Sequence, residues 1–127
     1  MKPVYTPDAV PPLPVFSQAT ISRGYVYASG NIGCTKEFKL VEGGIRAETR
    51  AALENLRKVL QATGSDLEHI VKANIYMRNM PEEFHMMNEI YAQFFSSDKM
   101  PARTCVGVAS LPFGAAMEIE CVAEIPN

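Results

Sequence analysis

The chain has 127 residues, of which 47% are hydrophobic and 20% are charged, and its formal net charge is −2. This length and balance fit one globular domain over residues 1–127 and exclude a disordered or fibrous protein. No run of lysine and arginine is long enough to form a basic stripe, which argues against a nucleic-acid partner.

The first 18 residues contain no uninterrupted apolar stretch, and their prolines and Asp8 would interrupt a signal peptide or a transit helix. No other segment approaches the roughly 20 apolar residues of a membrane helix, so we expect no membrane partner. Cys34, Cys105 and Cys121 lack the spacing of a disulfide framework and are expected to be free thiols. These features predict a cytoplasmic protein and leave a mitochondrial pool open.

The N-terminal third of the chain predicts strands. A short first strand precedes a Pro-rich loop at residues 7–14, and "SQATI" and "YVYASG" predict a hairpin joined by "SRG". A further loop ends at the double glycine Gly43-Gly44. From Ile45 onward, apolar residues recur at three- and four-residue steps, which predicts a long amphipathic helix that stops at Gly64.

The second half predicts a strand, a helix and two more strands. In "HIVKANIYM" the side chains of Ile70 and Lys72 are expected to share one side of a strand. Pro81, followed by two glutamates, predicts a helix over about residues 81–96. Asn88 lies on its apolar side and therefore needs a hydrogen-bond partner. The segments "ARTCVGVAS" and "MEIECVAEI" predict the last strands.

The order β-β-β-α-β-α-β-β predicts an α+β fold with a six-stranded mixed sheet and two helices on one face. Several strand residues look too apolar to face water on the other side of the sheet. We therefore predict that self-association buries this second face. The residues on which this prediction depends are Ile75, Met77, Val106, Val108, Ile119 and Cys121.

Arg103 opens an otherwise small and apolar strand. Alternation places it on the same side as Cys105 and Gly107, which leaves room beside a guanidinium that can bind a carboxylate through two parallel hydrogen bonds. In the last strand, Glu118 and Glu120 share one side, where one of them could act as a base. Spacing alone also allows a surface or ion-paired arginine and a solvated row of glutamates.

Two other kinds of site are disfavoured. Cys105 is interpreted as a packing residue rather than a nucleophile, because no histidine is placed near it. His69 and His85 have no second ligand at metal spacing, so no metal site is predicted.

The segment "PARTCVGVASLP", followed by "MEIEC", resembles the signature of the RidA/YjgF family of 2-iminobutanoate/2-iminopropanoate (enamine/imine) deaminases. The stretches "EGGIRAETRAALENLRKVLQ", "YASGNIG" and "MNEIYAQFF" resemble other parts of that family. The resemblance implies a homotrimer with a chorismate-mutase-like α+β fold, a barrel-like core and ligand clefts between subunits. It also implies a hydrolase that converts 2-aminoacrylate and related imines to 2-keto acids and ammonia without metal or cofactor, protecting pyridoxal-phosphate enzymes.

The resemblance assigns roles to individual residues. Arg103 would bind the carboxylate of a small-molecule substrate, and Cys105 would contact the ligand through its backbone. Glu118 would position the attacking water. Gly30 and Asn88 occupy two further positions of the family's ligand site.

Phe16 departs from the family pattern, because many members have a tyrosine at this position in a "PYSQ" stretch. The aromatic ring is retained here, but a phenolic hydrogen-bond donor is lost. Phe16 is therefore included among the substrate-binding positions with an altered role. The replacement of the family's tyrosine by Phe16 supports an alternative function, in which the protein is a non-catalytic carboxylate-binding or chaperone-like module. An endoribonuclease or translation-inhibitor role, ascribed to some members, is disfavoured by the lack of a basic stripe.

Overall fold

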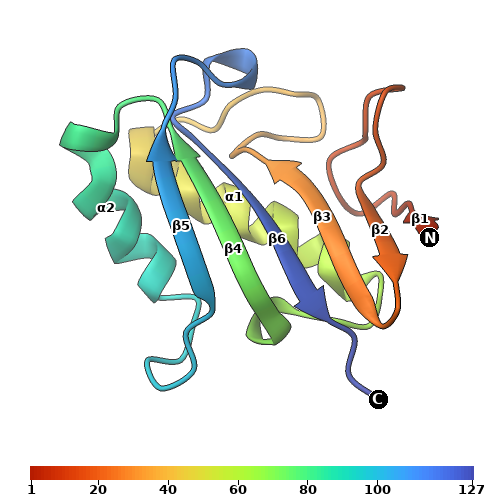
Figure 1. The fold of residues 1–127 in the computed structure, drawn as a ribbon. Helices are drawn as coiled ribbons and strands as arrows, with labels where there is room; N and C mark the ends of the chain where they lie inside the picture. The colour runs from red at the N-terminus through yellow and green to blue at the C-terminus, as the bar shows by residue number, and fades with distance from the viewer.

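The computed structural model describes residues 1–127 as one six-stranded sheet and two α-helices (Figure 1). The strand order is β1-β2-β3-β6-β4-β5, and only β4 and β5 run parallel. The predicted element order and mixed sheet are confirmed. The strands are β1 (Lys2–Val4), β2 (Ala19–Ser22), β3 (Tyr25–Asn31), β4 (Ile70–Met77), β5 (Ala102–Gly107) and β6 (Met117–Glu124).

The predicted hairpin joins β2 to β3. Its two central residues, Arg23 and Gly24, have φ angles of 52° and 82°. Positive φ at both positions is the requirement of a type I′ turn, whose twist matches that of the flanking strands.

Both helices differ from the prediction at their ends. Helix α1 (Gly44–Gln61) starts after Gly43, whose φ is 116°, and stops three residues before Gly64. Helix α2 (Met80–Ala92) is shorter than the predicted 81–96. Beyond Ala92 the chain continues in tighter turns, in which the Phe94 amide donates to the Tyr91 carbonyl at 3.0 Å.

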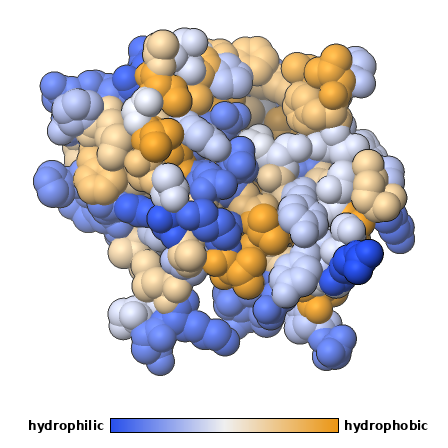
Figure 2. Space-filling model, viewed as in Figure 1, coloured by the Kyte–Doolittle hydropathy of each residue, from blue (hydrophilic) through white to orange (hydrophobic).

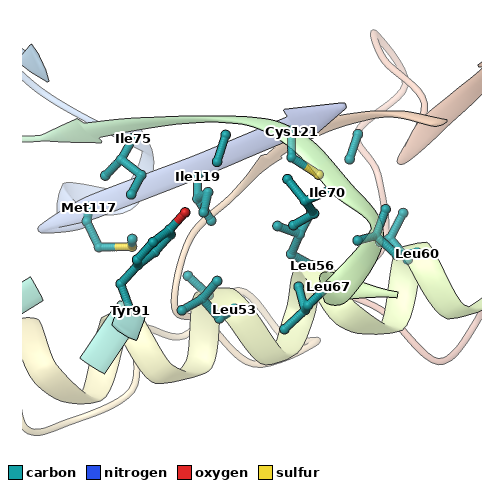
Figure 3. Packing of buried hydrophobic residues seen from close by; sticks show 14 of the residues in the cluster. Leu53, Leu56, Leu60, Leu67, Ile70, Ile75, Tyr91, Met117, Ile119 and Cys121 are labelled. Carbon is teal, nitrogen blue, oxygen red and sulfur yellow. The ribbon is translucent and has the colours of Figure 1, made fainter. Parts of the chain in front are cut away.

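The main core lies between the helices and one face of the sheet. In Figure 1, α1 crosses behind the strands and α2 lies beside it near the β5 edge. Leu53, Leu56 and Leu60 of α1 are fully buried against this face, and Tyr91 reaches into the same core from α2 (Figure 3). The two helices thus cover a single face, as predicted.

The alternation predicted for β4 is wrong at its first residues. The pairing of β4 with β6 shifts between Ile70 and Lys72, which marks a bulge. The extra residue places Ile70 in the core with Ala73, while Val71 is exposed. Ile70 and Lys72 therefore do not share a side.

Four of the six residues that predicted a buried second face lie on the covered face instead. Ile75, Met77, Ile119 and Cys121 point toward the helices and are 0–4% exposed within one chain. The uncovered face instead carries tyrosines, valines and charged residues. Hydrophobic and hydrophilic surface is intermixed in the view onto this face (Figure 2). Its exposed apolar residues include Tyr25, Tyr27, Val71 and Val106.

Neither helix combines the length and apolar character needed to cross a bilayer.

Candidate active site

The six candidate residues form two groups in one chain. Phe16, Gly30 and Glu118 line a cavity of about 290 Å³ beside β3 and β6. Asn88 and Arg103 line a second cavity, of about 270 Å³, between α2 and the start of β5. Cys105 lies on β5 next to the second group and packs against the core.

Glu118 contributes the only carboxylate of the first cavity. It is half-buried and accepts no hydrogen bond from this chain, whereas Glu120 accepts one from the Asn74 side-chain amide at 3.3 Å. Burial raises the pKa of the Glu118 carboxyl above its ordinary value, and the nearby Glu120 carboxylate raises it further. Glu118 is thus the unpaired carboxylate with a raised pKa, which suits a group that exchanges protons.

Gly30 provides the space that the Glu118 side chain occupies. A Cβ atom at residue 30 would lie 2.6 Å from both Cδ and Oε2 of Glu118. The φ angle of Gly30 lies outside the left-handed region, so the backbone itself does not require glycine here. The absence of a side chain is what permits this carboxylate position.

Phe16 and the Pro-rich loop form one wall of the first cavity. Phe16 is 47% exposed, and the preceding Val15 points away at 86% exposure. The loop is held by Gln18, a buried residue whose side-chain amide donates to the carbonyls of Thr6 at 3.0 Å and Val10 at 2.9 Å. The side-chain oxygen of Gln18 accepts from the Thr6 amide at 2.7 Å.

Two polar residues on the buried side of α1 were missed by the sequence analysis. Glu48 accepts a hydrogen bond from the backbone amide of Ala116 at 2.8 Å and so fixes the chain two residues before Glu118. Asn55 donates to the carbonyls of Ile32 and Cys34, each at 3.0 Å. Glu48 follows Ile45 by three residues, so the helical period that located the apolar face could have identified it.

Arg103 is held on the helix side of β5. Its Nη1 donates to the side-chain oxygen of Asn88 at 2.7 Å, which gives the Asn88 amide the partner that its position required. The guanidinium lies 4.9 Å from the ring centre of Tyr91 and 5.8 Å from that of Phe84. No carboxylate of the chain forms an ion pair with Arg103. Its remaining N–H groups can therefore bind an external anion.

Cys105 does not have the properties of a nucleophile. Burial raises the pKa of its thiol, and the opposing effect of the Arg103 charge is smaller. All three cysteines are free, as expected. No group of three or more histidine, cysteine, aspartate or glutamate side chains is arranged to hold a metal ion.

The sheet separates the two groups. In the parallel pairing of β4 with β5, Arg103 lies beside Ala73, whose side chain points toward the helices. In the antiparallel pairing of β4 with β6, Glu118 lies beside Tyr76, on the uncovered face. Arg103 and Glu118 thus occupy opposite faces of the sheet, and β4 lies between their two strands. Arg103 lines the second cavity together with residues of α2, whereas Cys105 and Gly107, expected beside it, are not among the residues that line this cavity.

Comparison with known proteins gives consistent matches along the chain. The family described as Endoribonuclease L-PSP matches residues 6–125. The chain is 39% identical over 118 residues to a human 2-iminobutanoate/2-iminopropanoate deaminase, covering 92% of this chain and 82% of the relative. It is 38% identical over 127 residues to "Protein MMF1, mitochondrial" of Saccharomyces cerevisiae, covering 100% of this chain and 86% of the relative. The crystal structure of yeast Mmf1 superposes with a TM-score of 0.93 at 37% identity, covering 98% of each chain.

Proposed function

The chain belongs to the Endoribonuclease L-PSP family, also known as RidA/YjgF or RutC, and on this basis we propose that it is an enamine/imine deaminase. It hydrolyses 2-iminopropanoate, 2-iminobutanoate and the enamine 2-aminoacrylate to 2-keto acids and ammonia, in the cytoplasm and without a cofactor. The observation that carries the proposal is the Glu118 carboxylate, which is unpaired, has a raised pKa and lines a cavity.

The proposed reaction needs one carboxylate-binding group and one proton acceptor. The guanidinium of Arg103 binds the substrate carboxylate, and its hydrogen bond to Asn88 fixes its orientation. Water adds to the imine carbon while Glu118 accepts a proton from it, and the proton then passes to the nitrogen. The carbinolamine hydroxyl then gives its proton to the amine nitrogen as the C–N bond breaks, which releases ammonia and the 2-keto acid. The enamine 2-aminoacrylate enters this sequence as 2-iminopropanoate, after it gains a proton at its terminal carbon and loses one from its nitrogen.

A second copy of the chain completes this site. Arg103 and Glu118 lie on opposite faces of the sheet, so one chain cannot offer both to a small substrate. A cyclic assembly, such as the proposed homotrimer, brings Arg103 of one subunit to Glu118 of the next through a head-to-tail interface. This requirement supports self-association more directly than the apolar character of the uncovered face.

The activity is tested with 2-aminoacrylate generated from serine by a dehydratase, in the presence of an amine that competes for the imine. The wild-type protein should accelerate pyruvate release. Arg103→Ala and Glu118→Gln should each lower the rate of imine hydrolysis about a hundredfold or more. Arg103→Lys should also have low activity, because an ammonium group does not offer the two parallel hydrogen bonds of a guanidinium. Equal rates for wild type and Arg103→Ala would refute the proposal. Binding of pyruvate without turnover would instead favour the carboxylate-binding module suggested by Phe16.

The shared site is tested by mixing the two inactive variants. If Arg103→Ala and Glu118→Gln subunits are dissociated and reassembled in equal amounts, about a quarter of the sites should combine an intact Arg103 with an intact Glu118. Activity should then recover to about a quarter of wild type. Reassembled mixtures that stay as inactive as the separate variants, or a wild-type protein that is a stable monomer, would contradict a site between subunits.

A further inference from the structure

Two aromatic residues from distant loops meet at the cavity that contains Glu118. The rings of Phe38 and Phe113 are stacked, with centres 5.6 Å apart and planes inclined by 23°. Phe38 lies in the loop between β3 and α1, and Phe113 lies in the short turn that precedes β6. Both residues line the cavity, although neither belongs to the proposed catalytic groups.

Both phenylalanines are held in an unfavourable backbone conformation. Their φ angles are 64° and 57°, and the only other non-glycine residue with positive φ is Arg23 in the β2–β3 turn. Bulky side chains rarely adopt this conformation, because Cβ approaches the backbone too closely. Each turn is fixed by backbone hydrogen bonds, from the Phe38 amide to the Thr35 carbonyl at 3.0 Å and from the Gly114 amide to the Leu111 carbonyl at 3.1 Å. Glycine would suit either position better for folding, so the rings point to a role at the cavity.

The cavity is larger and more apolar than the smallest substrates need. Its volume of about 290 Å³ is close to the lower end of the range for sites that enclose whole small molecules. Besides the phenylalanine pair, its walls include Pro11, Leu13 and Phe16. A substrate that carries a single methyl group would leave most of this apolar surface in contact with water.

We propose that Phe38 and Phe113 form the wall of a subsite for the side chain of the substrate, and that the protein prefers imines with branched aliphatic side chains. The proposal rests on the deaminase function proposed above. With the reacting carbon next to Glu118, the substrate side chain extends into the same cavity and contacts the two rings. An aliphatic side chain fits because the wall presents aromatic carbon and no charged group other than Glu118.

The preference is measured with imines generated in place from leucine and from alanine by an added amino-acid oxidase. The wild type should have a kcat/KM at least about tenfold higher for the leucine-derived imine, since each additional buried methylene favours binding about fourfold. Phe113→Gly and Phe38→Gly remove a ring and also relieve the positive φ, so both variants should fold. Each should reduce the leucine-to-alanine ratio about threefold or more. Val15→Ala removes an exposed apolar side chain outside the cavity and should leave the ratio unchanged.

Calorimetry with 4-methyl-2-oxopentanoate and pyruvate separates this proposal from the deaminase function. If the wild type hydrolyses the alanine-derived imine without preferring the leucine-derived one, or if the glycine variants keep the preference, the subsite is refuted and the deaminase stands. If neither imine is hydrolysed but the branched keto acid binds more tightly in a way that depends on both rings, the subsite stands and the deaminase is refuted. Failure to hydrolyse either imine, with no difference in binding, refutes both.

Discussion

Replacing Gly30 by alanine tests whether the position of the Glu118 carboxylate matters. The new methyl carbon would lie 2.6 Å from Cδ and Oε2 of Glu118, which is too close for atoms that are not bonded. Because the opposing atoms belong to a side chain, we expect Glu118 to change its rotamer at a cost of about 0.5–1.5 kcal/mol. A displacement of about 1 Å at a reacting group can cost about a hundredfold in rate. Gly30→Ala should therefore lower kcat/KM by about ten- to a hundredfold.

The assay for Gly30→Ala is imine hydrolysis combined with thermal denaturation. Its Tm should stay within a few degrees of wild type, since alanine in a strand offsets part of the rotamer cost. Gly107→Ala is the matched control, because a Cβ atom there would meet Met80 and Met77 only at 3.6 and 3.9 Å. Gly33→Ala serves as the reference for a variant that disrupts the fold, since its Cβ atom would lie 2.4 Å from the backbone oxygen of Glu48. Its Tm should fall clearly below that of wild type.

A double variant shows whether the effect passes through Glu118. In the Glu118→Ala background, Gly30→Ala should lower kcat/KM no further, because the carboxylate side chain that the new methyl group would displace is absent. Wild-type activity in Gly30→Ala would refute the reasoning. So would a further tenfold loss in the Glu118→Ala background.

Two further predictions concern the groups around Glu118. Glu48→Ala should lower the free energy of unfolding by about 1–3 kcal/mol in chemical denaturation, because the buried Ala116 amide loses its hydrogen-bond acceptor. Glu54→Ala, on the surface of α1, should change the free energy of unfolding little. Equal effects of the two substitutions would contradict this account. For pH dependence, Glu118 accepts a proton only when ionised, so kcat/KM should fall as pH decreases through its raised pKa. Glu120→Gln removes the negative charge that contributes to the raised pKa of Glu118, so the fall in kcat/KM should occur at lower pH. If the fall stays at the same pH or moves to higher pH, Glu118 is not the proton acceptor.

The order of elements was predictable because it depends on local patterns. The period of apolar residues located α1, and the "SRG" turn located the β2–β3 hairpin. The helix ends were less predictable, since α2 stops at Ala92 although apolar residues continue to Phe95. The bulge after Ile70 was not predictable, because nothing in the alternation of "HIVKANIYM" marks an extra residue.

The arrangement of the candidate site depends on relations between strands. Alternation correctly placed Glu118 and Glu120 on one side of β6, but it cannot determine which side faces the helices or how β5 is oriented relative to β6. The hydrogen bond between Arg103 and Asn88 depends on the β4-α2-β5 crossover, which brings two distant segments together. The positive φ angles of Phe38 and Phe113 have no signal in residue type, because phenylalanine rarely adopts this conformation.

The positions of Arg103 and Glu118 also change the reason to expect an oligomer. Four of the six apolar residues that predicted a face in need of a cover, Ile75 and Ile119 among them, are already buried by the helices of the same chain. Under the proposed function, a single chain lacks a complete set of groups for one substrate, since the arginine proposed to bind the carboxylate and the proposed base lie on opposite faces of the sheet. An assembly that pairs these faces would make activity depend on subunit contact. Dilution below the dissociation constant of the assembly should then abolish hydrolysis even where each chain stays folded.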